Sequence, residues 1–143
     1  MILKIFKGIW FFSLIGLLVV FFYVYAGLPE PVSLWEGETP VSISRNGLFY
    51  FSLLLMAVIN TMVFTIRNLI SKNNEPFNTW FYSLIIAINV FLIASFGLLT
   101  VTNGGERYDY GRMAPAVYGS LILICISLLS WPVYRISQRF SSK

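Results

Sequence analysis

Two amide side chains, Asn60 and Asn89, lie deep within long apolar stretches and are the strongest candidates for a specific role. An amide in hydrocarbon needs a hydrogen-bond partner, because leaving it unpaired costs roughly 2–7 kcal/mol on transfer scales. We therefore expect both amides to face protein. Two roles are open: a hydrogen bond that joins neighbouring helices, or the lining of a polar path for a ligand.

Acid–base, redox and metal chemistry have few candidate residues in this chain. There is no His, and Cys125 is the single cysteine. These counts exclude His proton relays, bis-histidine haem ligation and an internal disulfide. No Asp, Glu, Lys or Arg falls inside an apolar stretch, whereas proton-coupled carriers need an ionisable group within the bilayer. We predict no enzyme activity, no cofactor and no metal site.

The elements that must position the two amides are four transmembrane helices. The 143 residues are 57% hydrophobic and only 11% charged, whereas soluble domains contain about 25% charged residues. Four spans are predicted at about 5–26, 47–66, 78–101 and 114–134, and each has the roughly 20 residues that cross a bilayer core. The predicted fold is an all-α membrane protein, a four-helix bundle forming one integral membrane domain over residues 1–143.

The first span has a second interpretation, since Lys4 and Lys7 precede an apolar run as in a secretory signal. The run over residues 9–26 is longer than the roughly 7–15 residues of a signal core. We expect an uncleaved helix.

The basic residues predict the orientation. An even number of spans puts both termini on one side, together with seven cations and one acid, whereas the other side holds three cations and five acids. Cytoplasmic loops are enriched in Lys and Arg, so we expect both termini in the cytoplasm and the chain in the cytoplasmic (inner) membrane.

Small and hydroxylated side chains predict where helices pack. Ala57, Thr61 and Thr65 are spaced by four residues, and such positions let a neighbouring backbone approach closely. In the fourth span Pro115 is expected in the first turn, and Pro132 predicts a bend or an end near Leu128. We expect helix packing at Ala57, Thr65, Ala116 and Ser120, and intramembrane polar contacts at Asn60, Asn89, Thr61 and Ser127.

The two loops opposite the termini are candidates for contacts with other proteins. Alternating apolar and polar residues at 32–35 and 41–44 predict a short β-hairpin. Glu30, Glu36 and Glu38 lie around it, either as a solvated rim or as an acidic site. The expected external interface contains Trp35, Glu36, Arg107, Tyr108, Tyr110 and Arg112.

These observations favour a non-catalytic accessory, scaffold or assembly subunit of a larger bacterial membrane complex, such as a respiratory or secretion machine. Its partners would be membrane lipids and other integral subunits, with no nucleic acid. The alternative is a small oligomeric channel or carrier in which Asn60, Asn89, Thr61 and Ser127 line the route. An enzyme acting on lipids would need Ser, Tyr, Glu36 or Asp109 to act without a His base.

Overall fold

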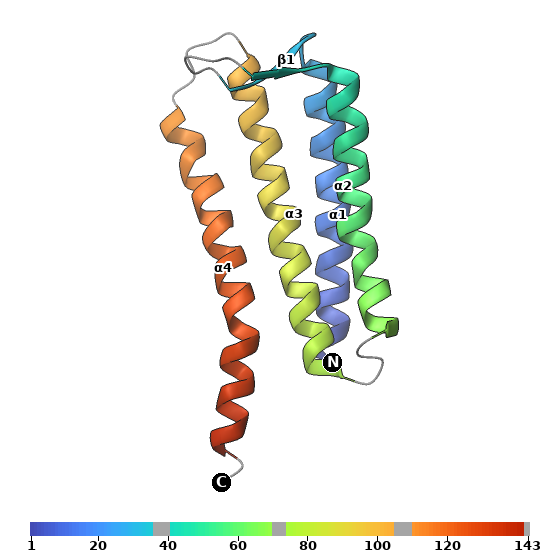
Figure 1. Cartoon of the computed structure of the whole chain (residues 1–143), viewed down its shortest axis with the longest axis vertical. Coiled ribbons are helices and arrows are strands. Elements are labelled where there is room, and N and C mark those ends of the chain that lie inside the picture. Colours follow the sequence, from blue (N-terminus) through green and yellow to red (C-terminus); the bar gives the residue numbers. More distant parts are fainter. Residues whose placement is uncertain (36–40, 70–73, 105–109, 142–143) are drawn as a thin grey trace.

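The computed structural model describes residues 1–35, 41–69, 74–104 and 110–141. These residues form four helices, α1 (Ile2–Gly27), α2 (Arg45–Leu69), α3 (Glu75–Asn103) and α4 (Tyr110–Ser141), and two strands, β1 (Val32–Trp35) and β2 (Val41–Ile43). All four helices are long and apolar enough to span a membrane, so the predicted fold class of a multi-pass membrane protein is confirmed. Both termini lie at one end of the bundle, here called the termini end, and the strands cover the other, the sheet end (Figure 1).

The helices are longer than the predicted spans, most of all α4. It begins at Tyr110, so Pro115 lies inside the helix and not in its first turn. It also continues through Pro132 to Ser141, so of the predicted bend or end near Leu128 the end is wrong, and the bend stays a prediction. At the start of α3, by contrast, local sequence explains the boundary. Asn74 Oδ1 accepts a hydrogen bond from the Phe77 backbone N–H at 3.1 Å, and Glu75 and Pro76 occupy the first turn.

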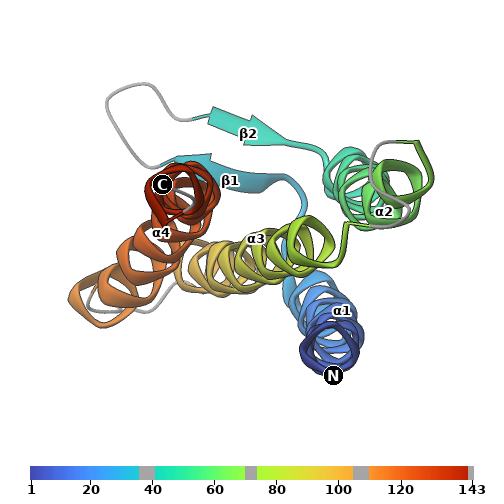
Figure 2. The ribbon, with the colours of Figure 1, turned by 90° about the horizontal axis from the view of Figure 1, so that it is seen from below.

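Helix α3 is the centre of the bundle, with α4 on one side and α1 and α2 on the other (Figure 2). Buried residues occur around much of its circumference, whereas α4 is mostly exposed. The core consists of two clusters. The sheet-end cluster contains Leu17, Phe21, Val24, Leu28, Val32, Leu48, Met56 and Phe96, and the termini-end cluster contains Val63, Phe81, Tyr82, Leu84 and Ile85.

The predicted β-hairpin is confirmed as an antiparallel pair in which Val32 faces Ile43 and Ser33 faces Ser42. Val32 packs into the sheet-end cluster, and the Asn103 side chain adds hydrogen bonds between the hairpin and the bundle. Asn103, in the last turn of α3, accepts from the Ser33 N–H through Oδ1 at 2.8 Å and donates through Nδ2 to the Ser33 carbonyl at 2.9 Å. The amide thus pairs with both backbone groups of Ser33, as a neighbouring strand would. The sheet is therefore held against α3.

Replacing Asn103 with Ala is expected to loosen this attachment. Two hydrogen bonds to Ser33 are lost, worth together about 1–2 kcal/mol, and local opening becomes roughly 5–30 times more frequent. Hydrogen exchange at the Ser33 amide measures this change. Thr102→Ala is the matched control, because the Thr102 hydroxyl donates only to the Leu98 carbonyl of its own helix, at 3.0 Å. Equal exchange rates in the two variants would contradict the role of Asn103.

Candidate functional site

The structure brings Asn60 of α2 and Asn89 of α3 together as a reciprocal pair. Asn60 Nδ2 donates to Asn89 Oδ1 at 3.1 Å, and Asn89 Nδ2 donates to Asn60 Oδ1 at the same distance. Both side chains are buried, Asn89 completely. Two amides in this arrangement form a cyclic pair with two nearly equivalent hydrogen bonds, and they join α2 to α3 at mid-bundle.

Helix α1 contributes two further groups that the sequence did not reveal. The Trp10 indole Nε1–H donates to Asn60 Oδ1 at 3.0 Å, and the Ser13 hydroxyl accepts from Asn89 Nδ2 at 3.0 Å. Ser13 in turn donates to the Trp10 carbonyl at 2.8 Å. The Trp10–Ser13 spacing of three residues puts both side chains on one helix face. The Trp10 indole thus bonds to a buried amide.

We call Trp10, Ser13, Asn60 and Asn89 the amide layer, and its donors are all used. The second N–H of Asn60 donates to the Met56 carbonyl at 3.0 Å, so both N–H groups of each Asn have acceptors within the chain. An amide offers two donors and one acceptor oxygen. None of the four side chains changes its charge near neutral pH. The layer therefore holds helices together and offers no N–H to a ligand.

The amide layer lies between the two apolar clusters. Along α2, Asn60 stands between Met56 of the sheet-end cluster and Val63 of the termini-end cluster. Asn89 stands likewise between Ile85 and Phe96 on α3. A polar layer between two apolar ones fixes how the helices are aligned along their axes, because sliding one helix by a turn breaks its hydrogen bonds at once.

Thr61 and Ser127 lie apart from this layer. The Thr61 hydroxyl is exposed and donates to the Ala57 carbonyl of its own helix at 2.7 Å. Ala57 and Thr65 lie on the same outer face of α2, whose buried stripe is Leu48, Ser52, Met56, Asn60 and Val63. The candidate route through all four residues is therefore not formed within the described chain, where Thr61 and Asn60 occupy different faces of α2.

Ser127 belongs to the contact between α3 and α4. Its carbonyl accepts from the Trp80 indole N–H at 2.6 Å and from the Ser130 hydroxyl at 2.7 Å. Ser120 is buried on the same face of α4 as Ser127, whereas Ala116 is exposed. Pro132 cannot donate to the Leu128 carbonyl, and the Trp80 contact lies next to this point. The Trp80 hydrogen bond therefore joins α4 to α3 where α4 is locally weakened.

A cleft of about 580 Å³ lies between α1, α3 and α4 toward the sheet end. Half of its lining residues are small: Ala94 and Gly97 of α3, and Ala116, Gly119 and Ser120 of α4. The other half are larger and apolar: Val20, Val90, Ile93, Met113 and Leu123. A Cβ placed on Gly119 would meet no atom within 4 Å. Ala116 and Ser120, expected at helix contacts, therefore line a space that this chain does not fill.

The expected external interface falls largely outside what the structure describes. Glu36, Arg107 and Tyr108 are not among the described residues. Trp35 lies at the end of β1, and Tyr110 and Arg112 lie in the first turn of α4. Cys125 is exposed on α4. Within the described ranges, no three His, Cys, Asp or Glu side chains form a metal site, and the expected lack of a cofactor stays a prediction.

Comparison with known proteins adds no family to this picture. No protein-family model, no curated protein and no solved structure matches the chain.

Proposed function

We propose that this chain is a non-catalytic accessory or assembly subunit of a larger membrane complex, and that a helix of a partner packs into the cleft between α3 and α4. The observation that carries the proposal is the cleft itself, with Gly97 and Gly119 on facing helices. Membrane helices associate through close van der Waals packing at small residues, because lipid removes the usual hydrophobic drive. A partner helix is the kind of occupant that such walls fit.

The closed amide layer favours this function over transport. Asn60 and Asn89 use their N–H groups on one another, on Ser13 and on the Met56 carbonyl, so a passing solute would have to displace those bonds. Flux through proteoliposomes that contain only this chain would overturn the accessory role in favour of the channel or carrier.

The proposed orientation puts the termini end in the cytoplasm. Five of the described cations lie at that end of the helices: Lys4, Lys7, Arg67, Arg135 and Arg139. Among the described residues, Glu75 is the acid at the same end. The positive-inside rule supports this placement and the inner membrane as its location. A C-terminal reporter that is active only outside the cytoplasm would contradict it.

Filling the cleft tests the proposed function. Gly119→Leu adds a side chain to the wall of the cleft, at a position where a Cβ meets open space. We expect it to reduce co-purification of partner subunits at least tenfold, because about 1.4 kcal/mol of lost packing suffices for that ratio. The measurement is the intact mass of the species extracted gently from native membranes.

Gly8→Leu is the matched control, because Gly8 is also a helical glycine with open space around it and does not line the cleft. It should leave the partner subunits bound. A lone monomer from native membranes, or equal loss of partners in both variants, would contradict the proposal.

A further inference from the structure

We propose that the termini end binds one anionic phospholipid, with an acyl chain in an apolar groove and the phosphate in a basic pocket beside it. This inference does not depend on the accessory role. It rests on two hollows of different chemistry that meet at the same two residues, Met1 and Glu75.

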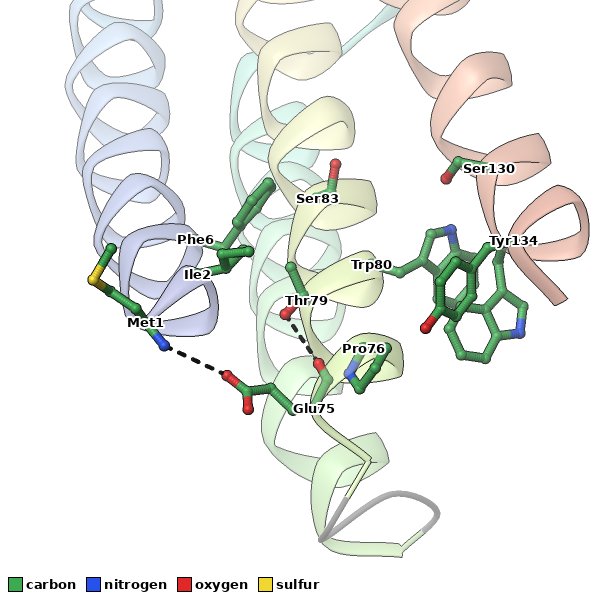
Figure 3. A pocket seen from close by; sticks show the side chains of 11 residues that line it. Met1, Ile2, Phe6, Glu75, Pro76, Thr79, Trp80, Ser83, Ser130 and Tyr134 are labelled. Atoms are coloured by element: carbon green, nitrogen blue, oxygen red, sulfur yellow. Dashed lines mark hydrogen bonds and ion pairs between the residues drawn. The ribbon is translucent and has the colours of Figure 1, made fainter. Parts of the chain in front are cut away.

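The apolar groove lies between α1, α3 and α4 and has a volume of about 850 Å³, within the roughly 300–1,000 Å³ of sites that hold small organic ligands. Figure 3 shows Ile2 and Phe6 on its α1 side and Trp80, Ser130 and Tyr134 toward α4. Trp80, Trp131 and Tyr134 together line the α4 side. Trp and Tyr are enriched at the boundary between hydrocarbon and headgroups. The groove therefore lies where the upper part of an acyl chain runs.

The basic pocket is smaller, about 270 Å³, and lies between α1, α2 and α3. Lys4 and Lys7 of α1 and Arg67 of α2 line it. Lys7 and Arg67 are half-buried, yet in the part of the chain that the structure describes none of the three cations has a carboxylate within ion-pair distance. Half-buried cations without an ion-pair partner favour binding of an anion.

Glu75 is the acid that lines both hollows, and its carboxylate faces the N-terminal ammonium group at 3.8 Å. The pair is exposed, so water screens it, and it gives way to a ligand that crosses it. Three side-chain cations remain against this one carboxylate. The charge balance of the pocket therefore favours a phosphate.

A phospholipid matches both hollows, because its apolar and anionic parts are adjacent, as the apolar groove and the basic pocket are. Its acyl chain fits the apolar groove at the depth of the Trp and Tyr side chains, and its phosphate fits the basic pocket beyond it. An acidic peptide would match the basic pocket alone and leave the groove unfilled. Among lipids the uncompensated cations select an anionic headgroup over a zwitterionic one.

The test measures which lipid the purified full-length chain keeps. The delipidated chain is mixed with equal amounts of phosphatidylglycerol and phosphatidylcholine of the same acyl composition, and bound lipid is counted by native mass spectrometry. We expect retention of one phosphatidylglycerol. Arg67→Gln should lower the ratio of bound phosphatidylglycerol to phosphatidylcholine about fivefold, the effect of about 1 kcal/mol per basic residue near a membrane surface. Lys7→Gln gives an independent measurement should Arg67→Gln fail to fold.

Arg139→Gln is the matched control, since it removes one cation from the same end but does not line either hollow. Its lipid ratio should equal that of the original chain. Ser83→Phe fills the groove and should release phosphatidylglycerol although all three cations remain. An excess of inorganic phosphate should fail to displace the lipid. Equal retention of both lipids, an equal loss in Arg139→Gln, or displacement by phosphate alone would overturn the proposal.

Discussion

Asn89→Leu is expected to lower the free energy of unfolding by about 1–3 kcal/mol, because it removes the partner of Asn60 and of Ser13 at once. Asn89 is fully buried, and a buried polar group that loses its partner keeps its desolvation penalty. Equilibrium unfolding in mixed micelles, followed by circular dichroism, measures the change. Trp10 bonds to Asn60 at 3.0 Å, so its fluorescence should change in the folded state as well.

A double-mutant cycle tests whether the amides act as a pair. Asn60→Leu combined with Asn89→Leu should cost less than the sum of the two single variants, since neither amide is then left with a missing partner. Thr61→Val is the control. The Thr61 hydroxyl donates to carbonyls of its own helix, those of Ala57 and Val58, so its loss should change stability by less than about 0.5 kcal/mol. Strict additivity of the two Asn substitutions would contradict the reciprocal pair.

Phe21→Ala should be the most damaging single substitution in the sheet-end cluster. Phe21 of α1 is only 2% exposed, and its ring centroid lies 5.5 Å from that of Phe49 in α2 and 5.1 Å from that of Phe96 in α3. Truncation leaves a cavity where three helices meet. We expect a loss of about 3 kcal/mol, the low end for Phe→Ala, because the unfolded chain in a membrane is also surrounded by apolar groups.

The neighbouring Phe22 provides the control for this substitution. Its side chain is 50% exposed, so Phe22→Ala removes mainly lipid-facing surface and should cost less than about 1 kcal/mol. The same unfolding experiment compares both variants. Similar losses for Phe21 and Phe22 would show that the aromatic contacts among α1, α2 and α3 do not carry the stability assigned to them.

Long apolar runs were enough to predict the four helices, and the alternation of apolar and polar residues was enough to predict the hairpin. Runs of apolar residues define membrane helices directly, and the alternation at 32–35 and 41–43 matches β1 and β2. A hydrogen bond between neighbouring helices was one of the two roles open for Asn60 and Asn89, and the structure pairs the two amides. The helices and the hairpin depend on the order of apolar and polar residues within one short segment, which can be read from the sequence directly.

The sequence did not predict which face of each helix turns toward its neighbours. Helix α1 is bulky and apolar on all sides, so no contrast between faces indicated that Trp10 and Ser13 turn inward. On α2, the small residues Ala57, Thr61 and Thr65 drew attention to a face that lies outside, while the buried face carries the larger Leu48 and Met56. In a bilayer both faces of a helix meet apolar surroundings, so composition distinguishes them poorly. Helix α4 also continues through Pro132, and near this point the Trp80 indole bonds to the Ser127 carbonyl, a contact that hydropathy does not indicate.

The side chains of the amide layer come from α1, α2 and α3, so every group in it is synthesised before the residues that follow Asn89, which include all of α4. During insertion the first three helices can therefore settle into their final alignment while α4 is still being made. Helix α4 then packs against the three helices that are already aligned. A nascent chain released after α3 should already resist extraction and proteolysis as a folded unit, and the late arrival of α4 leaves time for another polypeptide to meet it.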